Sequence, residues 1–269
     1  MEKKSGIRTL GFLLFTMAGL LLAGKHLVAL VWLSNSSEVY SYIPLIPFIS
    51  AYLFWMKRKT ILEQTSYSMV AGLIVSVGGV GLYAVAMMIG HFGNRGDFLS
   101  LVMGSFILWF LGGFICFYGL TAFKRALFPL GFLAFMIPIP TFILDPYITV
   151  LQKASAEVSY LVFKAIGVPV FRNGTVFELP GLTIEVARQC SGIRSSLALI
   201  LTTLLSGYLI LDTITYRILF IMAVVPIAVV KNGLRIVTIS LLAAYVDKIY
   251  ISSHWIHRSG GIPFFIAAL

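Results

Sequence analysis

The sequence predicts an all-α protein that crosses a membrane with about seven to eight helices. Hydrophobic residues make up 59% of its 269 residues, and charged residues only 11%. A soluble domain carries charge on roughly a quarter of its residues. The apolar residues also form several runs near the length of about 20 residues that a transmembrane helix needs. Composition and run length together indicate a polytopic membrane protein.

The basic residues lie mainly at the ends of these apolar runs and give a formal net charge of +10. In a membrane protein such residues report topology and contact with lipid, so the charge does not indicate a nucleic-acid partner. The two cysteines, Cys116 and Cys190, do not indicate a disulfide framework, and Cys116 lies inside an apolar run. The scattered histidines and few carboxylates predict no metal site, and we expect no cofactor.

The first half of the chain predicts five spans, each bounded by polar or basic residues. They cover about 7–23, 39–56, 66–90, 98–120 and 126–144, and the first could continue to Leu33. No small-residue cleavage site follows the N-terminal lysines, so we expect a retained span rather than a signal peptide. The third run is rich in Gly and Ala, which favours close helix packing.

The basic clusters orient these spans. If the spans alternate, Lys3-Lys4, 57–59 and Lys124-Arg125 all lie on one side. The positive-inside rule makes that side the cytoplasm. We therefore expect a cytoplasmic N-terminus in the cytoplasmic (inner) membrane, with the segment after the fifth span outside.

That outer segment, 145–189, predicts a small cap. In 145–166, apolar residues recur at helical spacing with polar interruptions, which is typical of an amphipathic helix on a membrane surface. In 168–186, short extended runs predict a hairpin with Asn173-Gly174 as its turn. The chain thus divides into a scaffold of N-terminal helices, 1–144, and a catalytic region, 145–269, that begins with the cap.

The second region predicts two more spans, at about 192–211 and 218–230. Lys231, Asn232 and Arg235 then interrupt the apolar pattern. Cations within a membrane are costly and indicate a function, or else they extend to the lipid headgroups. The run 234–245 is too short to cross, so we expect a separate helix that leaves the membrane or lies along it.

Cys190 lies where the polar cap meets the apolar run, between Arg188 and Arg194. Close to a helix N-terminus and to cations, a cysteine is expected to favour the thiolate. The alternative is a buried structural cysteine. The two arginines could lower the cysteine pKa or bind an acidic substrate, or they could anchor headgroups. Glu185 could pair with Arg188, or it could simply be solvated.

In this topology Cys190, Arg235 and the cluster 254–258, which contains two histidines, all reach the outer membrane face. A thiol, a guanidinium and an imidazole are the groups that acyl transfer through a thioester requires. The sequence therefore predicts an active site at that face.

Three motifs strengthen this prediction: Arg188-Gln189-Cys190-Ser191-Gly192-Ile193, Asn232-Gly233-Leu234-Arg235, and His257 three residues before Gly261. In order, spacing and multispan context they resemble the signature motifs of the exosortase/archaeosortase family. The resemblance covers roughly 129–269, whereas the earlier spans match only in being hydrophobic.

The resemblance implies roles for individual residues. Cys190 would be the nucleophile, Arg235 would stabilise the oxyanion or substrate, and His257 would be the general acid and base. Neighbouring His254 and Arg258 are alternatives for this third role. Arg188, Arg194 and Asn232 are assigned to substrate binding.

The resemblance also implies a membrane-embedded cysteine peptidase or transpeptidase. Its partners would be exported proteins whose C-terminal sorting signal has a short motif (Pro-Glu-Pro in the bacterial type), a transmembrane helix and a basic tail. The enzyme would cleave near the motif and transfer the protein to a membrane lipid or other acceptor. Oligomeric state does not follow from the sequence.

Two other functions remain open. A lipid-linked carrier or transporter could hold an anionic lipid phosphate with the same outer-face cations, Arg188, Arg194, Lys231 and Arg235. A purely structural membrane subunit would leave the motifs unexplained. Cys190 would be dispensable in both, whereas rapid reaction of Cys190 with a soluble alkylating agent near neutral pH would favour the enzyme.

Overall fold

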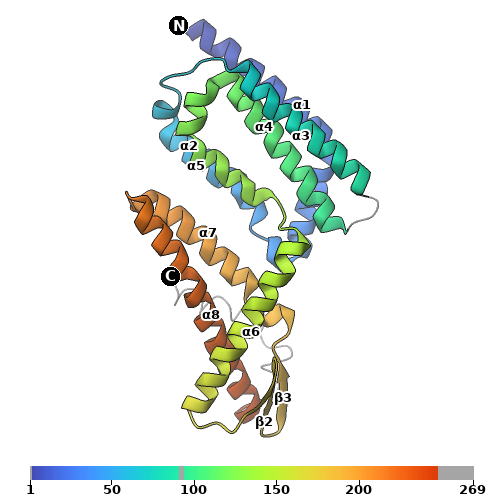
Figure 1. Cartoon of the computed structure of the whole chain (residues 1–269), viewed down its shortest axis with the longest axis vertical. Coiled ribbons are helices and arrows are strands. Elements are labelled where there is room, and N and C mark those ends of the chain that lie inside the picture. Colours follow the sequence, from blue (N-terminus) through green and yellow to red (C-terminus); the bar gives the residue numbers. More distant parts are fainter. Residues whose placement is uncertain (1, 91–93, 248–269) are drawn as a thin grey trace. The chain divides into compact units, whose positions relative to one another are not determined.

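A computed structural model describes residues 2–90 and 94–247, and the described chain is built of helices and one small sheet (Figure 1). The chain forms two compact units, Met1–Thr141 and Phe142–Leu269. We describe each unit by itself.

The described residues include six helical segments that are long and apolar enough to cross a membrane. They are Gly6–Ser36, Glu38–Ile61, Met69–Ile89, Arg95–Arg125, Ile193–Ile210 and Ile214–Tyr245. A seventh is reached if the broken pair Leu127–Met136 and Thr141–Ala165 counts as one span. The predicted class, an all-α polytopic membrane protein, is confirmed; the described residues give six spans, or seven with the broken pair, where seven to eight were expected.

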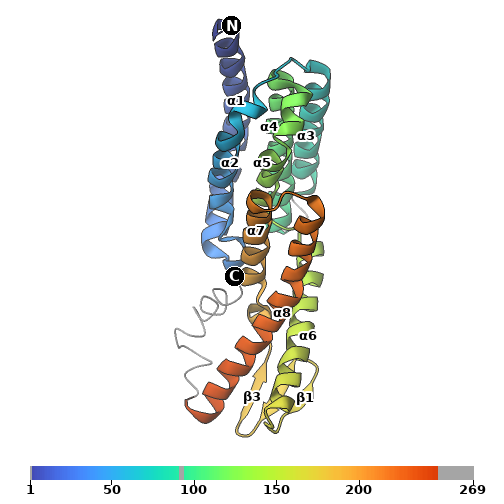
Figure 2. The ribbon, with the colours of Figure 1, turned by 90° about the vertical axis from the view of Figure 1, so that its left-hand side faces the viewer.

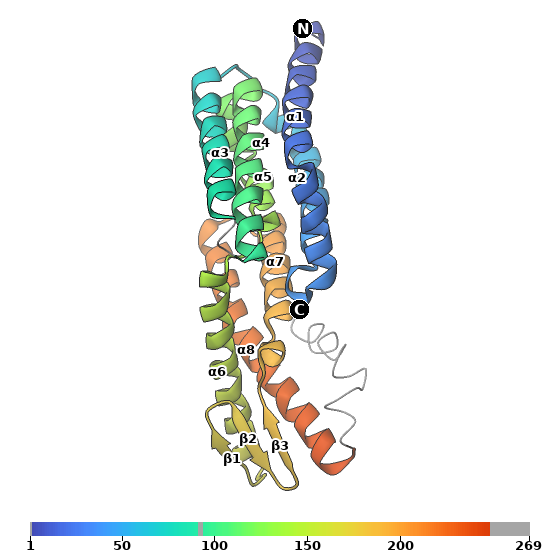
Figure 3. The same ribbon diagram turned by 90° about the vertical axis from the view of Figure 1, so that its right-hand side faces the viewer.

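The first unit contains α1 (Glu2–Ser36), α2 (Ile46–Ile61), α3 (Met69–Ile89), α4 (Arg95–Arg125) and α5 (Leu127–Phe132). Helices α3 and α4 lie side by side (Figure 3). A Cβ at Gly72 would lie 2.6 Å from the Gly112 oxygen, so the two backbones approach closely where both residues are glycine. Cys116 is buried in this packing, as its apolar surroundings indicate.

Two predicted spans of this unit differ from the structure. Helix α1 continues without a break through Lys25 to Ser36, which is the longer of the two expected alternatives. The predicted span 126–144 is not one helix: after α5 a 3-10 turn follows, and the chain around Pro138 and Pro140 is not helical. Proline lacks the N–H that a helix interior needs and keeps the preceding residue extended.

The second unit contains α6 (Thr141–Ala165), β1 (Phe171–Asn173), β2 (Val176–Leu179), β3 (Leu182–Glu185), α7 (Ile193–Ile210) and α8 (Ile214–Tyr245). Helices α7 and α8 form an antiparallel pair, and the sheet lies near the C-terminal end of α8 (Figure 2). One core cluster joins the elements: Phe163 of α6 and Phe177 of β2 pack with Ile236 and Val237 of α8. This core packs the sheet against α6 and α8.

The sheet is antiparallel in the order β1-β2-β3. Asn173 pairs with Val176, so the first turn is Gly174-Thr175 and the predicted turn Asn173-Gly174 is wrong by one residue. Pro180-Gly181 makes the second turn. Gly174 and Gly181 both have positive φ, 62° and 76°, which β-hairpin turns require and glycine adopts without strain.

Helix α8 runs unbroken through Lys231-Asn232-Gly233, and the separate helix expected at 234–245 is part of it. Its 32 residues at 1.5 Å per residue span about 48 Å, more than the roughly 30 Å hydrocarbon core. Position 233 needs a glycine because a Cβ there would lie only 2.6 Å from Val158 Cγ1 of α6. The missing side chain therefore lets α6 and α8 meet.

Candidate active site

Cys190 lies in a single 3-10 turn, Arg188–Ser191, between β3 and α7. Its backbone N–H donates to the Ala187 oxygen at 2.8 Å. The first residue of α7 follows only three positions later, so the cysteine does precede a helix N-terminus as the sequence indicates.

Gly192 links this turn to α7 in the left-handed conformation, with φ 77° and ψ 14°. A Cβ at this position would also lie 2.7 Å from Cγ and Oδ1 of Asn232. Both the backbone conformation and the close contact therefore require glycine. This is the physical reason for the glycine in the Cys-Ser-Gly sequence.

Asn232 holds the cysteine turn in place. Its side chain is 1% exposed, and its Nδ2 donates to the backbone oxygen of Cys190 at 2.9 Å and to Ser155 Oγ at 3.0 Å. One amide thus joins α8, α6 and the turn that carries the thiol. The sequence assigned Asn232 to substrate binding, whereas its amide hydrogens are engaged within the fold.

Helix α6 contributes a polar stripe to the same junction. Gln152 Nε2 donates to the Val186 oxygen at 2.9 Å, and Ser159 Oγ donates to the Gly233 oxygen at 3.1 Å. With Ser155, these residues recur at helical spacing on one face. Sequence reasoning missed them, although small polar side chains with that spacing in an amphipathic helix were a usable signal.

We predict that Asn232→Ala weakens the fold by about 1–3 kcal/mol, because it leaves the buried Cys190 carbonyl without its donor. Asn173→Ala, at an exposed position at the end of β1, is the matched control and should melt like the wild type. Thermal unfolding in detergent checks both variants. Equal melting temperatures for Asn232→Ala and wild type would contradict this role.

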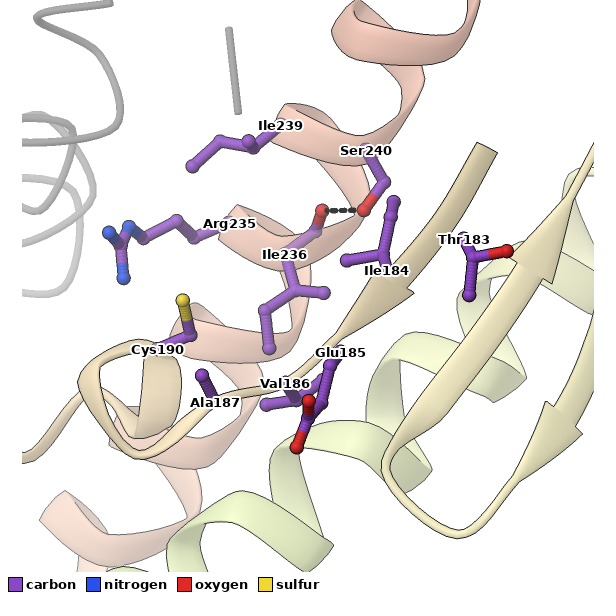
Figure 4. Close-up of a pocket in the computed structure, with 10 residues that line it drawn as sticks. All are labelled: Thr183, Ile184, Glu185, Val186, Ala187, Cys190, Arg235, Ile236, Ile239 and Ser240. Carbon is purple, nitrogen blue, oxygen red and sulfur yellow. Dashed lines mark hydrogen bonds between the residues drawn. The ribbon is translucent and has the colours of Figure 1, made fainter. Parts of the chain in front are cut away.

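A cavity of about 360 Å³ lies beside Cys190, and ten residues line it: Thr183, Ile184, Glu185, Val186, Ala187, Cys190, Arg235, Ile236, Ile239 and Ser240. Figure 4 shows the Cys190 sulfur pointing toward the Arg235 side chain. The structure therefore brings together two of the predicted catalytic residues, from the turn before α7 and from α8. The third, His257, lies outside the described residues, as do His254 and Arg258.

Arg188 and Arg194 do not line this cavity. Arg188 forms an ion pair with Asp145 of α6, N–O distance 2.5 Å, rather than with Glu185. Both partners are more than half exposed, so the pair contributes little to stability. Arg194 is exposed in the first turn of α7. Their assignment to substrate binding stays a prediction.

Burial raises the pKa of the Cys190 thiol above its usual range. The Arg235 guanidinium and a backbone hydrogen bond at Ala187 lower this pKa, but desolvation is the larger effect. This direction runs against the expected thiolate and favours a neutral thiol in the resting site at neutral pH. The cation that lowers the pKa of Cys190 is Arg235, rather than its sequence neighbours Arg188 and Arg194.

This shift predicts slow alkylation of Cys190 near neutral pH. Only the thiolate reacts, so the rate should rise as the pH passes above the ordinary thiol pKa. Arg235→Gln should move the profile to still higher pH, because it removes a charge that favours the thiolate. Reaction of the Cys116→Ser chain with soluble iodoacetamide, followed by mass spectrometry, isolates Cys190; a rate at pH 7 as high as that of an exposed cysteine would contradict this.

Lys231, one turn before Arg235 on α8, is buried, with 6% of its surface exposed. No residue that the structure describes hydrogen-bonds its Nζ atom. Since the ammonium group lies inside the second unit, the alternative in which Lys231 extends to the lipid headgroups does not hold for this side chain.

Comparison with known proteins gives one family. A family model described as transmembrane exosortase matches residues 32–269, and so extends into the first unit beyond the motifs themselves. No curated protein and no solved structure matches the chain.

Proposed function

Because the chain belongs to the transmembrane exosortase family, we propose that it is a cysteine transpeptidase that processes exported proteins within the membrane. Family membership supports a membrane sorting role in general. The observation that carries the finer proposal is that Cys190 and Arg235 line one cavity in the second unit. A nucleophile beside a fixed cation is the arrangement that acyl transfer uses.

In the proposed reaction, Cys190 Sγ attacks the carbonyl carbon of the scissile peptide bond. The thiol proton passes to a base, for which His257 is the candidate, and the Arg235 guanidinium stabilises the negative oxygen of the tetrahedral intermediate. The C–N bond then breaks, and the leaving amine takes the proton from the same residue. The product is a thioester on Cys190.

The second half of the reaction releases the exported protein. A nucleophile, either water or a hydroxyl or amine of a membrane acceptor, attacks the thioester and gives its proton to the base. The C–S bond breaks and the thiol is restored. Hydrolysis and transfer differ only in which nucleophile enters.

A neutral resting thiol is compatible with this scheme, so rapid alkylation near neutral pH no longer separates the enzyme from the two alternative functions. Desolvation disfavours a stable thiolate, so proton removal has to accompany substrate binding or attack. Within acylation, the base is then required for the attack of the thiol as well as for the departure of the amine. The resting enzyme would at the same time be protected from soluble electrophiles.

The proposed substrate is an exported protein with a Pro-Glu-Pro-type motif, a C-terminal transmembrane helix and a basic tail. The proposed location is the cytoplasmic membrane, with the N-terminus inside and the site facing outward. The placement of the basic clusters supports this orientation.

Co-expression tests the proposal. The wild-type chain is expressed with a reporter that ends in such a signal, and the reporter is analysed by intact mass. We expect loss of the C-terminal helix and tail, with any added mass identifying the acceptor, and a hydroxylamine-sensitive adduct on Cys190. An unprocessed reporter and no adduct would contradict the proposal and favour an anionic-lipid carrier.

A further inference from the structure

Strand β3 is at the edge of the sheet. Its one strand neighbour is β2, and no strand among the described residues pairs with its other side. An edge strand exposes a row of backbone N–H and C=O groups that can pair with another chain.

The register shows which groups are directed outward. Leu179 pairs with Leu182 across the two-residue turn, and Val186 N donates to the Thr175 oxygen at 2.9 Å. Positions 182, 184 and 186 therefore direct their backbone groups toward β2, since hydrogen bonding in an antiparallel ladder alternates. Thr183 and Glu185 direct theirs to the free edge.

Among the residues that the structure describes, these outward groups find few partners. The Glu185 oxygen accepts from Ala187 N at 2.9 Å. No residue that the structure describes hydrogen-bonds the N–H groups of Thr183 and Glu185 or the Thr183 oxygen. Two donors and one acceptor thus remain on one side of β3.

The cavity beside Cys190 follows this same edge. Five consecutive residues, Thr183 to Ala187, line it. Successive side chains of a strand point to opposite faces, so a cavity that touches consecutive residues must run along the backbone. The opposite wall is formed by Arg235, Ile236 and Ile239 of α8 (Figure 4).

We propose that this cavity binds the substrate as an extended strand added to the free edge of β3, with the scissile carbonyl delivered to Cys190. The proposal rests on the proposed function and names how that site holds its peptide. A strand at the usual spacing of about 4.7–4.9 Å would pair with the outward groups of Thr183 and Glu185. An extended peptide fits because it is the partner whose donors and acceptors repeat at the same two-residue interval.

The cavity also has the size and lining for such a peptide. Its volume of about 360 Å³ is within the roughly 300–1,000 Å³ of ligand sites, enough for a short segment. Ile184 of β3 and Ile236 and Ile239 of the α8 wall give it apolar surface, whereas Thr183 and Glu185 are exposed on the other face of β3. Alternate substrate side chains would therefore contact apolar surface and solvent. Main-chain pairing would supply affinity, and the three isoleucines would supply selectivity.

The enzyme side is tested with Thr183→Pro, which removes an outward N–H but no bond to β2. Proline is accepted at edge positions of this kind. We expect kcat/KM to fall about fivefold or more, the effect of losing one hydrogen bond. Thr183→Val keeps the N–H and serves as the comparison for the altered side chain, so kcat/KM of Thr183→Pro should lie clearly below that of Thr183→Val. The full-length protein is assayed with a synthetic peptide that spans the cleavage site mapped in the reporter.

The substrate side is tested by replacing the backbone amides of that peptide with esters, one at a time. An ester lacks the N–H donor but keeps the side chain. Added-strand binding predicts losses of about threefold to tenfold at every second position and little change between them. This series decides the question even if Thr183→Pro does not fold.

The outcomes separate the two proposals. If the wild type cleaves the peptide but the ester losses do not alternate, the added-strand proposal is overturned and the transpeptidase stands. The same conclusion follows if a folded Thr183→Pro chain behaves like Thr183→Val. If the wild type cleaves neither reporter nor peptide, the proposed function fails, and the binding mode fails with it.

Discussion

A Cys190→Ser chain is expected to leave the sorting signal of a co-expressed reporter uncleaved, with turnover reduced at least about a thousandfold. Serine keeps the shape of cysteine, but its hydroxyl is far less acidic, and the buried site would disfavour the alkoxide even more. Intact-mass analysis of the reporter measures the loss. Full processing by this variant would exclude the thioester mechanism.

The fold should not change in this variant. Asn232 holds the backbone oxygen of residue 190 and not its sulfur, so the hydrogen bond persists when the thiol is replaced. The melting temperature should therefore equal that of the wild type.

Cys116→Ser is the matched control, since it replaces the other cysteine. Cys116 is buried in the first unit, and its sulfur lies 3.7 Å from the Met69 oxygen, to which it donates. A serine hydroxyl can donate to the same group. Processing by Cys116→Ser should stay near the wild-type level, and a loss as large as that of Cys190→Ser would show that the assay reports general damage.

Arg235→Gln is expected to lower kcat by about a hundredfold to a thousandfold, the usual cost of removing one oxyanion donor. The oxyanion exists only after attack, so the loss should appear in kcat more than in KM. Arg235→Lys should recover part of the rate, because it restores the charge without the planar fork. The measurement is peptide cleavage at saturating substrate.

Arg217→Gln is the control for this substitution because Arg217 lies on the same helix but outside the cavity. Its guanidinium donates to the oxygen of Leu211, the residue that follows the last residue of α7. Cleavage by this variant should remain within a few-fold of the wild type. If Arg235→Gln raised KM and left kcat unchanged, Arg235 would bind the substrate rather than stabilise the transition state.

The helices of this protein could be predicted closely wherever local signals decide. The span expected at 192–211 is α7, Ile193–Ile210, because an apolar run bounded by polar residues leaves few alternatives. Pro138 and Pro140 were visible in the sequence, yet they were placed inside a span that they interrupt. The hairpin turn differed by one residue, because several neighbouring residues suit a turn and only strand pairing selects among them.

The candidate site was predictable in part. Cys190 stands out in the sequence since it lies at a boundary between polar and apolar segments. Its neighbours in space were harder: Arg188 pairs with Asp145, 43 positions away, and not with the nearby Glu185. Sequence distance did not point to Asp145, because only the fold brings helix α6 back to the cysteine turn.

By itself the sequence determined that this chain is a helical membrane protein with a cysteine before a helix, because hydrophobicity, run length and motif order are properties of the chain. Only the tertiary structure decided the state of that cysteine and what surrounds it. Packing of α6, α8 and β3 partly buries the thiol, raises its pKa, sets Arg235 beside it and leaves one strand edge facing the cavity. Burial and pairing depend on which surfaces meet, and residues far apart in the sequence supply those surfaces.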